Sequence, residues 1–193
     1  MDSRVTELHC IMPVENVASV LQRGILSHEQ AAKLPHQSVA MHAMQERRDV
    51  KTVPHGLKLH QYANLYFHAR NPMLSARRNQ DVCVLRVSTD VFDLKGAVIT
   101  DQNAASKYVR FYAPNQWQLL DFDDIYARDW THPADQIQEW RHKSRKCAEV
   151  LLPHMVPPNM IIGAYVVDDA ARTVLNQSGF ALPTVVDADF FFR

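Results

Sequence analysis

The sequence predicts a single α+β domain. Helical patterns concentrate in the first part of the chain, whereas strand patterns fall mostly in its middle and late parts. The strand patterns do not alternate regularly with long helices, so a doubly wound parallel sheet is not expected. With 193 residues, 47% of them apolar, the chain has enough material for one core. We therefore expect one domain that spans residues 1–193.

The first elements follow from local patterns. An apolar run over Leu8–Met12 predicts a buried strand. The next segment, Asn16–Arg23, has apolar residues at helical spacing and ends at Gly24, as helices often do. Ser27 and Gln30 form a capping-box pattern, which predicts that a second helix begins there.

The later elements are predicted on the same grounds. In order, they are a short helix over Val39–Arg47, a strand over Asn64–Arg70, a helix over Pro72–Arg78, strands over Val82–Val87 and Gly96–Thr100, an irregular aromatic and acidic region over Phe111–Trp130, a helix from Pro133 to Lys143, strands over Cys147–Leu152 and Ile161–Val167, and a last helix over Asp168–Leu175 that stops near Gly179.

Composition excludes several classes of protein. The formal net charge is zero, which argues against a protein that coats nucleic acid. Three cysteines without CxxC spacing make a disulfide framework or a zinc ribbon improbable. The chain begins without an apolar leader, and its longest apolar run, Met160–Val167, is too short to span a membrane. We therefore expect a cytoplasmic protein. Glycine-rich phosphate motifs and metalloprotease motifs are absent from the sequence, and we expect no metal.

Glu149 is the first candidate for chemistry, because it is a carboxylate within the apolar strand pattern of residues 148–152. A buried carboxylate is costly unless it is paired or used. The alternative is that strand alternation places Glu149 on the solvent face.

Other candidates are cations and aromatic residues. Arg47 and Arg48 end a helical pattern, and arginine suits bidentate pairing with phosphate. Their alternative is a solvated helix terminus. The stretch Tyr62–Leu74 interleaves aromatic rings with His68 and Arg70, as base stacking beside phosphate contacts requires, although a core strand also buries such rings. His9 is a further candidate, with a satisfied core histidine as its alternative.

Taken together, these segments resemble the DarT toxins, a family of DNA ADP-ribosyltransferases. The resemblance rests on LHCIMPVENVASVLQRGILS (Leu8 to Ser27), ERRDVKTVP (Glu46 to Pro54), YANLYFHARNPML (Tyr62 to Leu74), VITDQNAAS (Val98 to Ser106) and KCAEVLLP (Lys146 to Pro153), which keep the family's order along the chain.

The resemblance implies an ADP-ribosyltransferase-like fold, in which two small, mainly antiparallel sheets with flanking helices form a cleft for NAD. Glu149 matches the catalytic glutamate, which stabilises the charge that develops as nicotinamide departs. Arg48 matches the active-site arginine, assigned to NAD contact and to accepting the proton of the target base, although a guanidinium is a poor base. The segment Ala31–Asp49 is expected to cover the cofactor. The implied NAD contacts are His9, Cys10, Ile11, Ser19, Ser27 and Arg48.

The implied reaction transfers ADP-ribose from NAD to a base in single-stranded DNA, most simply thymine. The region from about Asn103 to Glu149 is expected to present the target, and a macrodomain antitoxin is the expected partner. The expected DNA contacts are Arg47, Tyr66, Arg70, Asn103 and Arg110, with Trp117, Tyr126 and Trp130 as stacking residues.

Several alternatives stay open. Family members often carry histidine where this chain has Asp101-Gln102-Asn103, so guanine is an alternative target. RNA or protein as the acceptor and a non-catalytic nucleic-acid-binding domain are further alternatives. The neutral total conceals one basic region, because residues 41–80 contain seven Lys or Arg against two Asp or Glu. That region includes Arg48 and the aromatic stretch, and is where we expect the cleft.

Overall fold

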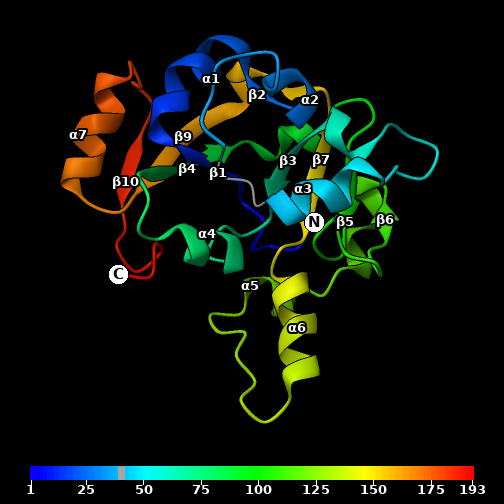
Figure 1. Ribbon diagram of the computed structural model, residues 1–193. Helices are drawn as coiled ribbons and strands as arrows, with labels where there is room; N and C mark the ends of the chain where they lie inside the picture. Colours follow the sequence, from blue (N-terminus) through cyan, green and yellow to red (C-terminus); the bar gives the residue numbers. More distant parts are fainter. Residues whose placement is uncertain (39–41) are drawn as a thin grey trace.

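The computed structural model describes residues 1–38 and 42–193, which form an α+β fold as predicted (Figure 1). One sheet has eight strands in the order β10-β9-β4-β1-β3-β7-β5-β6, and β2 and β8 form a separate pair. The pairs are antiparallel except β9 with β10. The strands are β1 (Leu8–Pro13), β2 (Ile25–Leu26), β3 (Tyr62–Tyr66), β4 (Val82–Val87), β5 (Val98–Thr100), β6 (Phe111–Tyr112), β7 (Glu149–Pro153), β8 (Met155–Val156), β9 (Ile161–Val166) and β10 (Thr184–Val186).

The large sheet is split at its middle. Strands β1 and β3 meet at a single register pair, His9 opposite Tyr66. By contrast, β1 pairs with β4 at six positions and β3 pairs with β7 at five. The sheet therefore consists of two halves, β10-β9-β4-β1 and β3-β7-β5-β6, joined at one point. This arrangement agrees with the expected pair of small, mainly antiparallel sheets.

The two faces of the sheet differ in chemistry. Alternation along the strands places apolar side chains such as Leu65, Leu85 and Val150 in the main core, which Val17 and Val20 of α1 also enter. The opposite face carries a row of polar side chains, because directly paired residues point to the same side of a sheet. This row consists of Glu149, Tyr66, His9 and Arg86, taken from four neighbouring strands.

The helices lie around this split sheet, with α1 and α2 over one end and α6 projecting from the body (Figure 1). Short polar side chains cap several of them, including Ser27 on α2 and Asp168 on α7. None of the helices in the described ranges has the length and apolarity that a membrane span requires. Their bounds are α1 (Val17–Arg23), α2 (His28–Ala31), α3 (His42–Asp49), α4 (Pro72–Arg77), α5 (Phe122–Tyr126), α6 (Gln136–Arg145) and α7 (Asp169–Gln177).

Some boundaries differ from the predictions. The helix expected from Pro133 begins at Gln136, because the Asp135 side chain accepts the amide hydrogens of Ile137 and Gln138. The strand expected to reach Arg70 ends at Tyr66. The helix expected over Val39–Arg47 is observed as α3, and residues 39–41 lie outside the described ranges.

Strand β10 was not predicted. It is short, it pairs in parallel with β9, and Val185 and Val186 are exposed. The three cysteines are free and buried, and burial raises the pKa of each thiol, Cys10, Cys83 and Cys147, to about 12.

Candidate active site

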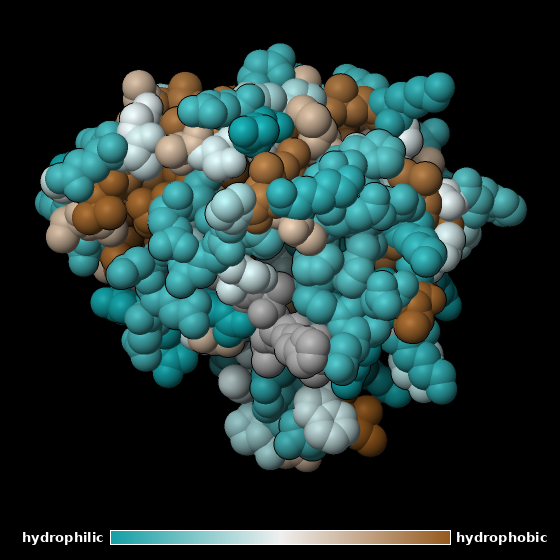
Figure 2. Space-filling model, turned by 45° about the horizontal axis from the view of Figure 1, so that its top comes forward, coloured by the Kyte–Doolittle hydropathy of each residue, from teal (hydrophilic) through white to brown (hydrophobic). Residues whose placement is uncertain are grey.

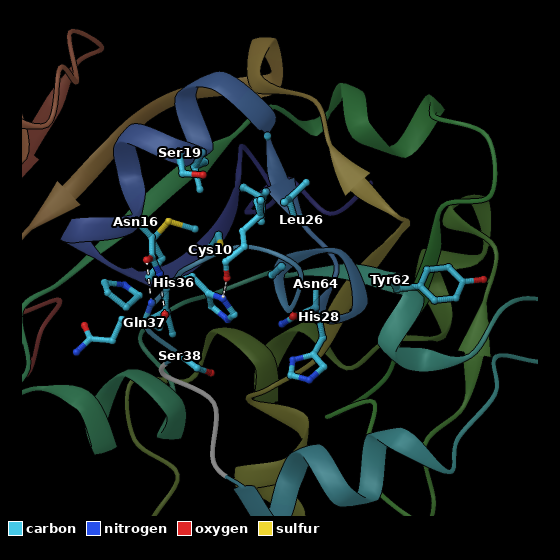
Figure 3. Close-up of a pocket in the computed structure, with 18 of the residues that line it drawn as sticks. Cys10, Asn16, Ser19, Leu26, His28, His36, Gln37, Ser38, Tyr62 and Asn64 are labelled. Carbon is cyan, nitrogen blue, oxygen red and sulfur yellow. Dashed lines mark hydrogen bonds between the residues drawn. The ribbon is translucent and has the colours of Figure 1, made fainter.

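A cavity of about 190 Å³ opens where β1 and β3 part (Figure 3). Beyond the His9–Tyr66 pair, the residues that would continue the ladder line this cavity instead, including Ile11 and Pro13 of β1 and Tyr62 and Asn64 of β3. Asn16, the N-cap of α1, and Ser19 and Val20 of α1 also line it. The segment before α3 adds Leu34, Pro35, His36, Gln37 and Ser38, and α3 adds Gln45 and Arg48.

Glu149 lies beside this cavity at the start of β7. Its side chain has no exposed surface, so the alternative that it faces solvent is wrong. Nη1 of Arg48 donates to both carboxylate oxygens, at 3.2 Å to Oε1 and 3.0 Å to Oε2. The backbone N–H of Ala104 also donates to Oε1, at 2.9 Å. These donors satisfy the hydrogen-bonding capacity of a carboxylate that is buried.

The backbone of Glu149 is held as well. Its N–H donates to Oγ1 of Thr100 at 2.9 Å, and the Thr100 hydroxyl donates to the carbonyl of Gln102 at 2.7 Å. Thr100 is completely buried in β5, the strand next to β7. The carboxylate is thus fixed at both its side chain and its peptide, as electrostatic catalysis requires.

Arg48 stands between the cavity and Glu149. It is 8% exposed and lines the cavity, whereas Glu149 does not, so the alternative of a solvated helix terminus is wrong for Arg48. Arg47 is exposed. Nζ of Lys51, three residues after Arg48, donates to the carbonyl of Ser106. Burial and the nearby Arg48 lower the pKa of Lys51.

Histidine rings line another wall of the cavity. The rings of His28 and His60 lie with centroids 4.4 Å apart. Burial, followed by the positive charges of His60, His36 and Arg48, lowers the pKa of His28, which keeps this ring neutral at neutral pH. Among the described residues, Gln45 Oε1 and His60 Nε2 are buried without a hydrogen-bond partner. Buried unpaired polar atoms near a cavity are consistent with a polar ligand.

The implied NAD residues divide into two groups. Cys10, Ile11, Ser19 and Arg48 line the cavity. His9 does not, because its ring nitrogens lie 3.2 Å from the Phe67 carbonyl and 3.2 Å from Oε1 of Glu7, on the polar face of the sheet. Ser27 is buried and caps α2, with its Oγ accepting the amide hydrogen of Gln30. Residues 34–38, Gln45 and Arg48 flank the cavity, as expected for a segment that covers a ligand.

The expected DNA contacts also divide. Arg47 and Asn103 line a second cavity on the other side of α3. Tyr66 is buried directly opposite Glu149, and burial raises its pKa well above the usual value. Arg70 is engaged elsewhere, donating to the carbonyls of Asp189 and Arg128 and lying 4.4 Å above the ring of Phe192. Arg110 is exposed on the loop before β6.

The expected stacking residues lie away from the cavity. Trp117 packs against the main core, and Tyr126 donates its hydroxyl to the Phe67 carbonyl at 3.1 Å. Trp130 packs edge-on against Phe192. The structure therefore gives these three rings packing partners.

Several cavity residues were not predicted. Asn16 donates from Nδ2 to the carbonyl of Gln37 at 2.7 Å and accepts the amide hydrogen of Gln37 at 3.1 Å, which ties α1 to the covering segment. These residues have no local sequence signal because they come together only in the fold. The others are His28, His36, Gln45 and Asn64. Within residues 1–38 and 42–193, no group of three or more His, Cys, Asp or Glu is arranged to hold a metal ion.

Comparisons with known proteins agree with this geometry. A family model described as "ssDNA thymidine ADP-ribosyltransferase, DarT" matches residues 9–192. The chain is 29% identical over 208 residues to a "DNA ADP-ribosyl transferase-DNA ADP-ribosyl glycohydrolase fusion protein" of Thermosipho africanus, and this match covers 100% of the chain and 51% of the relative. The chain thus spans about half the length of that fusion protein.

Two solved structures are similar over most of the chain. "Thermosipho africanus DarTG in complex with ADP-ribose" has a TM-score of 0.81 and 27% identity, and the match covers 96% of this chain and 51% of that one. "Thermus sp. 2.9 DarT in complex with ADP-ribosylated ssDNA" has a TM-score of 0.81 and 25% identity, with 96% of each chain covered.

Proposed function

The chain belongs to the DarT family, and we propose that it transfers the ADP-ribosyl group of NAD to a thymine base in single-stranded DNA and releases nicotinamide. The observation that carries the proposal is the buried Glu149, held by Arg48 and Ala104 beside a cavity at the split of the sheet. A carboxylate with two fixed donors suits stabilisation of positive charge that develops during reaction.

The cavity suits one part of a dinucleotide. His28 and the unpaired Oε1 of Gln45 line the cavity and offer polar partners, and the Thermosipho relative is described with ADP-ribose bound. The cavity is open to solvent at the exposed residues His36 and Gln37, and we propose that the rest of NAD extends along them. We propose that Cys10, Ile11, Ser19 and Arg48 contact NAD directly and that His9 and Ser27 support the walls around it.

The residues around Glu149 define the chemistry. NAD supplies an ADP-ribosyl group whose bond to nicotinamide breaks with its electron pair on the departing nicotinamide. A ring nitrogen of the base bonds to the same carbon, and its proton is released to water. Glu149 stabilises the positive charge on the ribose. Arg48 orients the Glu149 carboxylate. Its guanidinium must move aside for the ribose to reach Glu149, because Arg48 lies between the cavity and Glu149. A base paired in a duplex does not offer that nitrogen, so single strands are the expected acceptors.

The test is a transfer assay with purified protein, NAD and single-stranded oligonucleotides of different base composition, analysed by intact mass. Addition of ADP-ribose to thymine-containing strands supports the proposal. Addition only to guanine-containing strands overturns the choice of base, and an unchanged mass for every strand overturns DNA as the acceptor. RNA and total protein are included as further acceptors. Addition of ADP-ribose to one of them, and not to DNA, would identify it as the acceptor.

Glu149→Gln is the matched variant for this assay. The amide still accepts from Ala104 and Arg48 but lacks the charge, so transfer is expected to fall by about 10²- to 10³-fold or more. DNA binding by the wild type and Glu149→Gln alike, with no transfer by either, would instead favour a non-catalytic nucleic-acid-binding domain.

We further propose a macrodomain-type partner that removes the modification, and a cytoplasmic location. The support is the Thermosipho relative, which is named as a fusion of the transferase with a glycohydrolase and is about twice as long. Reversal of the mass increase by such a glycohydrolase, and rescue of growth when it is co-expressed, are the expected results.

A further inference from the structure

A second cavity lies next to Glu149, on the side away from the first one. Its volume is about 440 Å³, and α3, the loop 103–108 and α6 line it. We call it the α6 groove and define it by Arg47, Asn103, Lys107, Tyr108, Trp140 and Lys143. In Figure 1, α6 lies beneath α3 on the same side of the molecule.

Residues that hold Glu149 and residues that line the groove are neighbours along the chain. Arg48 pairs with Glu149, and its neighbour Arg47 lines the α6 groove. Ala104 donates to Glu149, and its neighbours Asn103 and Ala105 line the groove. A molecule in the groove therefore lies beside the carboxylate while a dinucleotide occupies the first cavity.

The groove presents two large aromatic rings to solvent. Trp140 is 63% exposed and Tyr108 is 77% exposed. The face in Figure 2 is mostly hydrophilic, with apolar surface in scattered patches. Tyr108 and Trp140 are the aromatic residues among the exposed large hydrophobic side chains of the described ranges. Flat exposed rings are the side chains on which unpaired bases stack.

The charge of the groove is positive. Arg47, Lys107 and Lys143 line it, and no acidic residue of the described part of the chain does. Nζ of Lys107 lies 5.9 Å from the ring centre of Tyr108, so cation and ring form one surface. Lys143 also donates to Oε1 of Glu139 at 2.6 Å, so it has a partner that a phosphate must compete with. Alternating cations and rings match the alternating phosphates and bases of a single strand.

Resting on the proposed function, we propose that the α6 groove binds the nucleotides that flank the target base in single-stranded DNA. Trp140 and Tyr108 stack on flanking bases, and Arg47, Lys107 and Lys143 contact phosphates. Stacking accepts every base, so this subsite contributes affinity and orientation, while the identity of the target is set beside Glu149.

The test compares variants of the groove by fluorescence polarisation of a labelled oligonucleotide and by the KM for DNA at saturating NAD. Trp140→Ala is expected to raise both the Kd and the KM for a long oligonucleotide about 10-fold, within the range of base–aromatic stacking, with the KM for NAD unchanged. Trp140→Phe keeps a ring and restores most of the affinity, whereas Trp140→Leu keeps only apolar volume and does not.

Control variants come from the same helix and the same surface. Ile137→Ala changes a 58% exposed side chain of α6 that does not line the groove and leaves the Kd unchanged. Loss of Lys107 lowers the slope of log Kd against log salt by about 0.7, as expected for one lost phosphate contact on a single strand, whereas Lys95→Ala, outside the groove, does not. Wild-type transfer to DNA with no effect of Trp140→Ala and Tyr108→Ala on the Kd or KM overturns the subsite alone. Absence of transfer by the wild type overturns the proposed function itself.

Discussion

Lys146 and His68 form a buried contact in which the lysine Nζ lies 3.2 Å from Nδ1 of the imidazole. Lys146 is completely buried, and its Nζ also donates to the carbonyls of Ile125 at 2.9 Å and Ala127 at 2.6 Å. It thereby ties α5 and the end of β3 to the chain just before Glu149. Burial lowers the pKa of Lys146 to about 8, and burial followed by the charge of Lys146 lowers the pKa of His68 to about 3.

The first prediction concerns alkaline pH. The lysine pKa is about 8 in the folded chain and near 10.5 in the unfolded chain, so between these values the unfolded chain binds more protons. The free energy of unfolding contributed by Lys146 therefore rises with pH across this window, by up to about 3 kcal/mol, and is lost as pH falls through it. In chemical denaturation at several pH values, Lys146→Met should lack this rise relative to the wild type, and Lys95→Met should retain it. Equal pH slopes for the wild type and Lys146→Met would contradict the assignment.

The second prediction concerns acid. The pKa of His68 is about 3 when folded and near 6.5 when unfolded, so its contribution to the free energy of unfolding falls as pH falls from 6.5 towards 3. His68→Gln keeps an acceptor for Lys146 but cannot take a proton. Its melting temperature should decline less than that of the wild type between pH 6.5 and pH 4, and a parallel decline would exclude His68 as the titrating group.

The third prediction separates two glycines with positive φ. A Cβ on Gly24 would lie 2.2 Å from the carbonyl oxygen of Val156, whereas a Cβ on Gly179 would have no neighbour within 4 Å. Gly179→Ala should cost about 1 kcal/mol for its backbone conformation alone. Gly24→Ala should cost about 1–3 kcal/mol more, because the β2–β8 pair must shift. Urea denaturation measures the free energy of unfolding of both variants. Equal losses would show that the contact with the Val156 carbonyl is relieved at no cost in stability.

The fourth prediction makes Thr100 a positioning residue for Glu149. Thr100→Val leaves the buried N–H of Glu149 without its acceptor, which should lower the free energy of unfolding by about 1–3 kcal/mol. A shifted carboxylate should lower kcat about 10-fold with little change in the KM for NAD. Thr100→Ser keeps the hydroxyl and should restore kcat. A rise in KM without a fall in kcat would instead place Thr100 in substrate binding.

Local patterns predicted most of the elements, because capping residues and apolar spacing act within a few residues. Ser27 and Asp168 cap the helices that their positions suggested, and Leu8–Pro13 is buried throughout. The patterns did not predict β10, since its three residues depend on pairing with β9 and two of them are exposed.

The candidate site was only partly predictable. Glu149 and Arg48 followed from the resemblance to the family, and their contact joins residues 101 positions apart. The contact between Asn16 and Gln37, the rings of His28 and His60, and the exposed rings of the α6 groove depend on tertiary packing. No spacing along the chain encodes such contacts.

The single register pair between His9 and Tyr66 affects how much the sequence of this family can change while the pocket is kept. In a sheet, the N–H and C=O of every second residue point towards the same neighbouring strand, so past this pair such groups of β1 and β3 face the cavity instead of each other. A ligand there meets main-chain donors and acceptors in the place of a missing strand. Main-chain groups survive side-chain replacement, so a pocket built in this way persists through extensive drift, in keeping with a shared fold at 25–27% identity.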